Sequence, residues 1–172
     1  MSLTPDYMFH TYDEITPQFL KRIGVSAVLS DIDNTLAPYE MPEPDEKILA
    51  WAKSLADNGI KLALISNNSP ERVEKFNGKL GLPAYPDSHK PGVKILKKAL
   101  KELGADPEKH NVAVVGDQLL TDVAAARRLG AKAIIVPPIK DKKTLFFRFK
   151  RALEKPIIKK FLKTRGFEKA EE

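Results

Sequence analysis

Two aspartates, Asp31 and Asp33, stand two residues apart directly after a short apolar run, Val25 to Leu29. The run is rich in aliphatic and β-branched residues and follows Gly24, which predicts a buried parallel strand. Two carboxylates this close raise each other's pKa unless positive charge neutralises them. A divalent cation at the carboxyl end of the strand would supply that charge. The pair therefore predicts a metal-assisted acid or nucleophile site.

Other polar residues follow further predicted strands. Parallel strands place their carboxyl ends at one edge of a sheet, so side chains from distant parts of the chain are expected to meet there. A set of carboxylates, a hydroxyl, an amide and an ammonium, without histidine or cysteine, is the oxygen-rich chemistry that Mg²⁺ prefers. The candidate site residues are Asp31, Asp33, Ser66, Asn67, Lys90, Asp117 and Asp122.

This set fits chemistry at a phosphoryl group. A phosphoryl group is an anion, so a carboxylate approaches it only when a metal ion and a lysine cancel the repulsion. One aspartate can then attack phosphorus. A second carboxylate, held protonated by its anionic neighbour, can give its proton to the leaving alcohol and later activate water.

The elements that position these residues alternate along the chain. Such alternation predicts an α/β fold, a three-layer doubly wound, Rossmann-like parallel sheet of five strands with helices on both faces. Met1 to Asp13 has mixed polarity and is expected to be only partly ordered. The expected strands are 25–29, 60–65, 82–85, 112–115 and 133–136, and the expected helices are 18–23, 45–58, 70–80, 93–103 and 123–129.

Four segments, in chain order, resemble the four motifs of the haloacid dehalogenase (HAD) superfamily. Each follows the strand that the resemblance requires, over roughly residues 25 to 136. An aspartate at position 33 is typical of the phosphatases and phosphomutases of that superfamily. The segments are Asp31-Ile32-Asp33-Asn34-Thr35, Ser66, Lys90, and Gly116-Asp117 with Thr121-Asp122.

The resemblance implies a role for each residue. Asp31 would be the nucleophile that forms an aspartyl-phosphate, and Asp33 the general acid and base, which also offers its backbone carbonyl to Mg²⁺. Lys90 would be catalytic and, with Ser66 and Asn67, would hold the phosphoryl oxygens. The expected metal residues are Asp31, Asp33, Asp117 and Asp122.

Each residue also has a plainer interpretation. Asp33 and Thr35 can cap a turn, and Asp117 or Asp122 can cap the helix that follows, since aspartate favours that position. A lysine before a Pro-Gly turn, as at Lys90, is usually exposed. Only the joint occurrence of the four motifs favours the catalytic interpretation.

The spacing of the motifs leaves no room for a cap domain. Ser66 lies 33 positions after Asp33, and Lys90 lies 24 positions after Ser66. One helix and one strand fill each interval. We therefore expect an open site, which suits a phosphate on a large or anchored molecule such as a protein, a nucleic acid end or a lipid head group.

The chain has 172 residues, enough for one domain, and no cysteine. Residues 1–138 are nearly neutral, whereas residues 139–172 carry 12 Lys and Arg against 5 Asp and Glu. The absence of cysteine, of a basic and apolar leader and of a long apolar run favours a soluble cytoplasmic protein. The phosphatase domain is expected over 1–138. Because that part is nearly neutral and the tail is basic, we expect the tail to contact any anionic partner.

The tail, 139–172, predicts a basic amphipathic helical segment that Pro156 divides into two helices. Two interpretations remain open and are compatible. The apolar stripe packs on its own domain or a partner copy, or it lies on an anionic membrane, here the inner surface of the cell membrane. The stripe consists of Phe146, Phe149, Leu153, Ile157 and Phe161.

Within the superfamily, the chain resembles the capless subfamily IIIA phosphatases of the YqeG type. It is also similar to the mitochondrial phosphatases that act on phosphatidylglycerophosphate, which implies a lipid phosphate as substrate. The alternatives are a phosphatase of nucleic acid ends or nucleotides, which the neutral body disfavours, and a non-catalytic scaffold that binds a membrane or a protein. Oligomeric state is left open. The segments that carry the likeness are Asp31 to Leu36, Ser66 to Asn68, His89 to Pro91 and Gly116 to Asp122.

Overall fold

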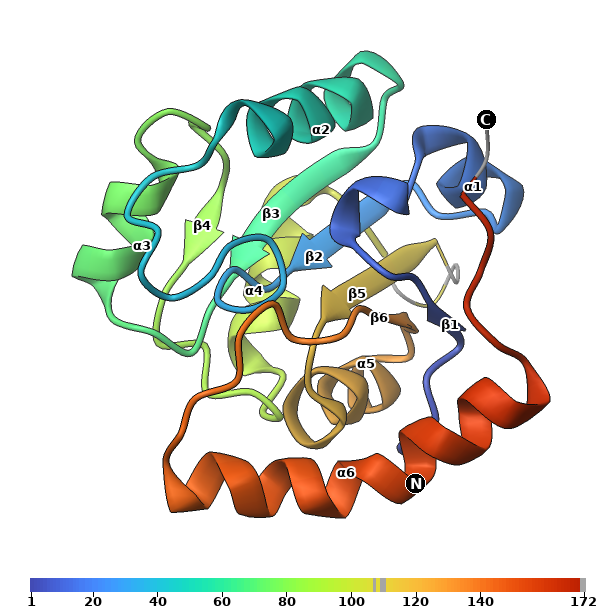
Figure 1. The fold of residues 1–172 in the computed structure, drawn as a ribbon. Coiled ribbons are helices and arrows are strands. Elements are labelled where there is room, and N and C mark those ends of the chain that lie inside the picture. The colour runs from blue at the N-terminus through green and yellow to red at the C-terminus, as the bar shows by residue number, and fades with distance from the viewer. Residues whose placement is uncertain (107, 109–110, 171–172) are drawn as a thin grey trace.

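The computed structural model describes residues 1–106, 108 and 111–170, which form a parallel sheet with helices on both sides (Figure 1). The strand order is β1-β6-β5-β2-β3-β4, and every pairing is parallel. The five predicted strands are all present, and β2 lies between β5 and β3. They are β2 (Ala27–Ser30), β3 (Lys61–Ile65), β4 (Ala84–Tyr85), β5 (Val112–Gly116) and β6 (Lys132–Ile135).

A sixth strand, β1 (Tyr7–Met8), corrects the predicted count of five. It pairs with the edge strand β6, with Tyr7 opposite Ile134 and Met8 opposite Ile135. Two residues are too short for an alternating pattern to be recognised in a polar segment. Met8 is buried, so this N-terminal segment belongs to the core and is not the partly ordered one expected.

Two of the predicted helices begin at the side-chain caps that the sequence indicates. The Thr16 hydroxyl accepts a hydrogen bond from Phe19 N, and the Ser69 hydroxyl accepts one from Arg72 N. In both helices a proline occupies the first turn, where its missing N–H costs nothing. The helices are η1 (Tyr12–Glu14), α1 (Pro17–Arg22), α2 (Glu46–Asp57), α3 (Pro70–Asn77), α4 (Lys94–Leu103) and α5 (Ala124–Leu129).

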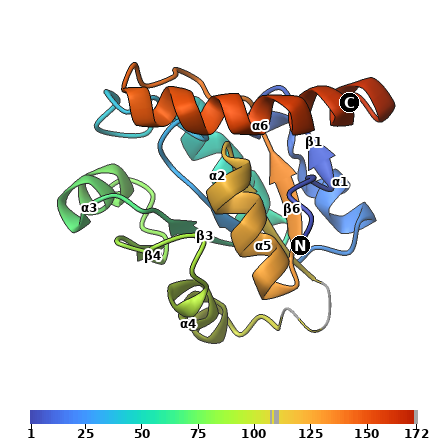
Figure 2. The same cartoon turned by 90° about the horizontal axis from the view of Figure 1, so that it is seen from below.

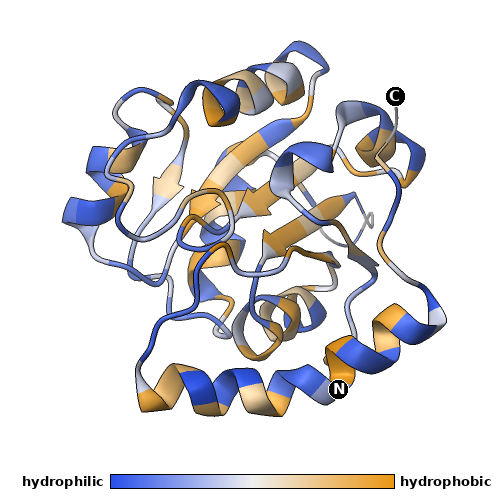
Figure 3. Cartoon of the chain, viewed as in Figure 1, coloured by the Kyte–Doolittle hydropathy of each residue, from blue (hydrophilic) through white to orange (hydrophobic). Residues whose placement is uncertain are grey.

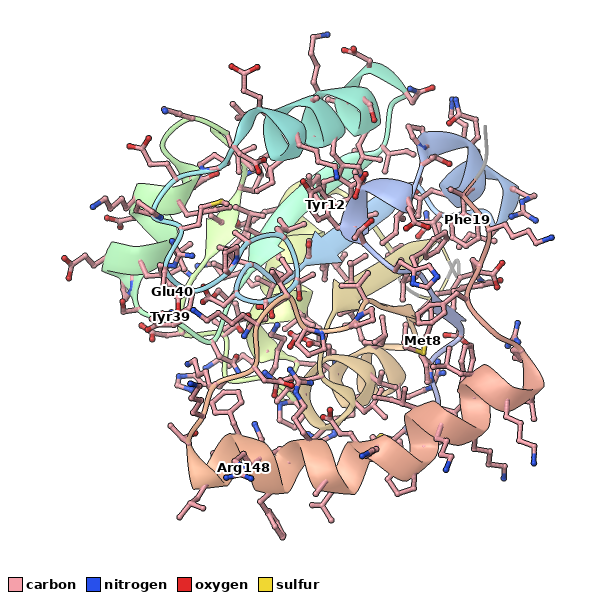
Figure 4. All side chains as sticks on the ribbon, viewed as in Figure 1. Met8, Tyr12, Phe19, Tyr39, Glu40 and Arg148 are labelled. Atoms are coloured by element: carbon pink, nitrogen blue, oxygen red, sulfur yellow. The ribbon has the colours of Figure 1, made fainter. Side chains whose placement is uncertain are left out.

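The helices form two layers, one on each face of the sheet, which confirms the three-layer prediction. Side chains of α1, α2 and α3 pack on one face, and those of α4, α5 and the last helix pack on the other. Phe19 and Met8, labelled in Figure 4, belong to these two separate clusters. Figure 3 shows the resulting pattern, with apolar strands and hydrophilic outer helix surfaces.

Both intervals between the motifs are filled by elements of the sheet and its layers. Residues 34–65 form a loop, α2 and β3, and residues 67–89 form α3, β4 and their connections. Loops and the segment that leads to the last helix lie beside the carboxyl end of β2 (Figure 1).

The tail forms one helix, α6 (Leu145–Thr164), and the predicted break at Pro156 is wrong. A proline inside a helix removes one N–H donor and costs about 3 kcal/mol. Burial of Glu154 and Phe161, on either side of the proline, holds the helix together across it. Both views place α6 beside α5 (Figures 1 and 2). Within the described part of the chain, no helix has the length and apolar character needed to cross a bilayer.

Candidate active site

The sheet edge brings three aspartates from two strand ends into one buried cluster. Asp31 follows β2, Asp117 follows β5, and Asp122 lies in η3 (Leu119–Val123), a π-helical turn before α5. One carboxylate oxygen of each lies within 4.8 Å of the other two. Side chains from distant parts of the sequence therefore meet as the parallel topology predicts.

Lys90 lies between two of these carboxylates. Its Nζ is 3.2 Å from Asp31 Oδ1 and 2.7 Å from Asp122 Oδ1. The side chain is only 3% exposed, so the plainer interpretation of an exposed lysine does not hold. Burial alone would lower the pKa of Lys90, but Asp122 and Asp31 raise it overall. The ammonium is therefore a fixed positive charge beside Asp31.

Asn67 holds the Lys90 loop in place. Its Oδ1 accepts hydrogen bonds from Lys90 N at 2.7 Å and from the Ser88 hydroxyl at 2.8 Å, and its Nδ2 donates to Lys90 O at 3.1 Å. These bonds make Asn67 a positioning residue for Lys90. The phosphate contact expected for this side chain stays a prediction.

Ser66 ends β3 and is buried. Its hydroxyl oxygen accepts a hydrogen bond from Asn68 N at 3.0 Å, which orients the side chain and leaves the hydroxyl proton to be donated. Ser66 lines a pocket of about 220 Å³ together with Asp31 and Lys90. Tyr39, Lys142 and Phe147 also line this pocket, in which the acidic and basic groups converge.

Thr35 connects two aspartates of the cluster. Its hydroxyl lies 3.4 Å from Asp31 Oδ2 and 3.2 Å from Asp117 Oδ1, so these two oxygens share one neighbour. The sequence offers Thr35 only as part of the first motif or as a turn cap. Its contact with Asp117, 82 positions away, depends on the fold.

Asp33 lines the same pocket as Asp31, but the hydrogen bonds of its carboxylate go to residues outside the aspartate cluster. Arg72 donates to its Oδ1 from Nε at 3.2 Å and from Nη2 at 3.0 Å, and Asn68 Nδ2 donates to its Oδ2 at 2.9 Å. Both carboxylate oxygens of Asp33 therefore accept hydrogen bonds from α3 and the loop before it, and its role as general acid and base stays a prediction. Arg72 was not expected at the site, since sequence shows it only in the first turn of a capped helix.

Burial raises the pKa values of two aspartates in the cluster, because the charged form of a carboxyl group is disfavoured away from water. Burial raises the pKa of Asp31 well above its usual range, although Lys90 opposes the shift. Burial and Asp122 raise the pKa of Asp117 to about 6, against the opposing effect of Arg151. Three carboxylates with oxygens this close fit a divalent cation, and an all-oxygen donor set suits Mg²⁺.

Asp122 occupies space that only a glycine leaves free. Its Oδ2 accepts hydrogen bonds from Asp117 N at 3.2 Å and Gln118 N at 3.1 Å, which folds the side chain back over Gly116. A Cβ at Gly116 would overlap the Asp122 carboxyl group. The predicted helix 123–129 corresponds to α5, and the π-helical turn η3 before it places Asp122 in the cluster.

Gly116→Ala is expected to displace Asp122 and disturb the cluster. Overpacking a rigid site costs about 1–3 kcal/mol, and a misplacement of this kind lowers turnover by about 10²-fold. Thermal unfolding and aryl phosphate turnover measure the two effects. Gly78→Ala is the matched control, because Gly78 is exposed with an ordinary helical backbone and should tolerate a methyl group. Wild-type turnover in Gly116→Ala would contradict the packing argument.

Comparison with known proteins is consistent with this geometry. The family described as haloacid dehalogenase-like hydrolase matches residues 11–130. Over 154 residues the chain is 33% identical to "Probable phosphatase YqeG" of Bacillus subtilis (strain 168), covering 90% of this chain and 88% of that one.

Two solved structures share the fold. The cobalt-bound deoxy-D-mannose-octulosonate 8-phosphate phosphatase of Haemophilus influenzae is 16% identical, with a TM-score of 0.54, and the match covers 83% of this chain and 94% of that one. A probable YrbI family phosphatase of Pseudomonas syringae pv. phaseolica is 20% identical, with a TM-score of 0.53 and coverages of 87% and 93%. At these identities the likeness shows the fold alone.

The chain belongs to the haloacid dehalogenase-like hydrolase family, since the family match spans more than half of its length. Within that family it is a HAD-type phosphatase, as its curated relative is named and as the acidic cluster beside Lys90 suits.

Proposed function

We propose that the protein is a Mg²⁺-dependent phosphomonoester hydrolase that works through an aspartyl-phosphate at Asp31. The observation that carries this proposal is the position of Asp31, which lines the pocket and lies within 3.2 Å of the buried Lys90 ammonium. A carboxylate that attacks an anionic phosphoryl group needs such positive charge beside it.

Asp31, Asp117 and Asp122 would hold the metal ion, with Asp33 contributing its backbone carbonyl. When bound, Mg²⁺ supplies positive charge that the buried carboxylates lack and that the phosphoryl oxygens require. The Thr35 hydroxyl, which contacts Asp31 Oδ2 and Asp117 Oδ1, would help to hold these two ligands together. Lys90 and the Ser66 hydroxyl would hold the phosphoryl oxygens in the pocket.

The reaction would proceed in two steps. A carboxylate oxygen of Asp31 forms a bond to phosphorus, the bond from phosphorus to the leaving oxygen breaks, and Asp33 gives that oxygen a proton. Water then attacks the aspartyl-phosphate, Asp33 takes a proton from this water, and inorganic phosphate leaves with Asp31 restored. For both transfers the Asp33 carboxyl must part from Arg72, which holds it here.

Metal removal tests the cofactor part of this proposal. We expect a chelator to abolish phosphate release from an aryl phosphate and added Mg²⁺ to restore it. Full turnover in the presence of the chelator would contradict the proposal. A spectroscopic check that the chelated protein stays folded separates loss of chemistry from loss of structure.

We further propose that the enzyme is of the capless subfamily IIIA and that its substrate is a lipid phosphate, such as phosphatidylglycerophosphate, at an anionic membrane. The first half of α6 exposes apolar side chains beside lysines and arginines, including Arg148, labelled in Figure 4. Such a face suits an anionic bilayer surface. The exposed residues are Leu145 (83%), Phe146 (64%), Phe149 (62%) and Leu153 (50%).

The second half of α6 packs against the core, and we propose that the tail, described through residue 170, forms part of the same folded unit as the rest of the described chain. Phe161 is buried, and Ile157 and Phe167 pack against the same cluster as Met8. The apolar stripe of the tail therefore packs on the domain in its second half, while its first half is exposed and would be available to a membrane.

Phosphatidylglycerophosphate in anionic vesicles and a 3′-phosphorylated oligonucleotide distinguish the substrate classes. We expect faster turnover of the lipid. Replacing Phe146 and Phe149 by serine should lower vesicle turnover at least about tenfold more than aryl phosphate turnover, because two apolar anchors are lost. Preference for the oligonucleotide, or equal losses on both substrates, would contradict the membrane proposal.

A further inference from the structure

Helix α6 contacts the segment that carries Asp117 through consecutive turns. Arg151 Nη2 donates to Asp117 Oδ2 at 2.5 Å, and Arg151 Nη1 donates to Asp117 O at 2.8 Å. Glu154 Oε1 accepts from Leu120 N at 3.0 Å, and Lys150 Nζ donates to Gln118 Oε1 at 3.2 Å. The helix thus binds both ends of residues 117–120.

The contact is specific in its chemistry. Glu154 is 1% exposed and lies 3.1 Å from Arg151, so a buried carboxylate and a guanidinium are paired at this point. Buried charges are costly unless they are paired and hydrogen-bonded, which both are. In the same half of α6, Phe146 and Phe149 are exposed. Polar contacts at the Asp117 segment hold this half of the helix to the domain.

The two oxygens of Asp117 have different partners. Thr35, which also contacts Asp31 Oδ2, contacts Oδ1 of Asp117, while Arg151 contacts Oδ2. A guanidinium that also binds the backbone carbonyl of Asp117 fixes both the chain and the rotation of the side chain. With Oδ2 held by Arg151, Oδ1 stays at the Thr35 hydroxyl, which also contacts Asp31.

We propose that Arg151 is a positioning residue for the metal ligand Asp117 and that α6 thereby completes the active site. This inference rests on the proposed function, in which Asp117 holds Mg²⁺. Arg151 acts through the orientation of Asp117 and not through its charge, which by itself would repel a divalent cation. Glu154 supports it by holding Arg151 and the Leu120 end of the same segment.

Direct measurement of Mg²⁺ affinity by calorimetry, without substrate, tests the inference on the full chain. Arg151→Gln removes both the charge and the geometry, whereas Arg151→Lys keeps the charge but lacks the planar fork. We expect both variants to bind Mg²⁺ about 10–100-fold more weakly, the usual cost of losing a residue that orients a ligand. Lys163→Gln, an exposed change of equal charge on the same helix, is the control and should bind as the wild type does.

Tighter binding by Arg151→Gln would show that Arg151 competes with the metal, and unchanged affinity in Arg151→Lys would show that charge alone matters; either overturns the inference. If Arg151→Gln does not fold, Arg151→Lys decides the question, with Glu154→Gln expected to show a smaller loss. Absence of Mg²⁺ binding by the wild-type protein would contradict the proposed function itself, which distinguishes that failure from failure of the inference.

Discussion

Asp31→Asn is expected to lower turnover of an aryl phosphate by at least about three orders of magnitude, because an amide of the same shape has no carboxylate oxygen to attack phosphorus. The variant should unfold at a temperature no lower than that of the wild type. Burial raises the pKa of Asp31, so the folded state disfavours its charged form. A carboxyl group with a raised pKa loses stabilising effect as the pH rises, and a neutral amide avoids that loss at pH 7.

This pairing of effects separates chemistry from folding. Phosphate release and thermal unfolding are measured on the same preparation, with Asp57→Asn as the control. Asp57 is an exposed aspartate at the end of α2, so the same change there should leave turnover unaltered. Turnover near that of the wild type in Asp31→Asn would favour a non-catalytic role for this aspartate, or a different nucleophile.

Asp33→Asn is expected to lower turnover of an alkyl phosphate by about 10²–10⁴-fold, the usual contribution of a general acid and base. The loss should be smaller for a nitrophenyl phosphate in the first step, because that leaving group departs without a proton. The same change also affects structure, because the amide in Asp33→Asn can still accept the hydrogen bond from Asn68 but loses the ion pair with Arg72.

The dependence on the leaving group distinguishes the two roles of Asp33. A loss of equal size for alkyl and nitrophenyl phosphates would assign Asp33 to structure, through its bonds to Arg72 and Asn68. Arg72→Gln is the comparison variant, because it removes the ion pair with Asp33 but keeps the Asp33 carboxyl group. Single-turnover kinetics with each substrate measure the first step alone.

The sequence predicts those parts of the fold that local patterns determine. Thr16 and Ser69 mark helix starts, and the apolar runs before Asp31 and Asp117 mark the strands whose ends meet. It does not reveal β1, because a two-residue strand derives its stability from β6 across the chain and not from its own pattern. The continuity of α6 through Pro156 likewise depends on tertiary contacts of Glu154.

The same distinction applies to the candidate site. Residues that the motifs contain, such as Asp31 and Lys90, are predicted and lie together. Partners from other elements are not predicted, since Arg72 and Arg151 resemble many other surface cations in the sequence. Arg151 is one of 12 basic residues in the tail, and only the packing of α6 beside η3 places it against Asp117.

The most direct test of the central claim is detection of the phosphoryl group on Asp31. The full-length protein is quenched in acid during turnover of an aryl phosphate with Mg²⁺ and analysed by mass spectrometry after proteolysis. We predict one phosphoryl group on the peptide that contains Asp31, and none when Asp31→Asn is treated in the same way. Turnover with no phosphorylated peptide, or with the phosphoryl group on a different residue, would contradict the account.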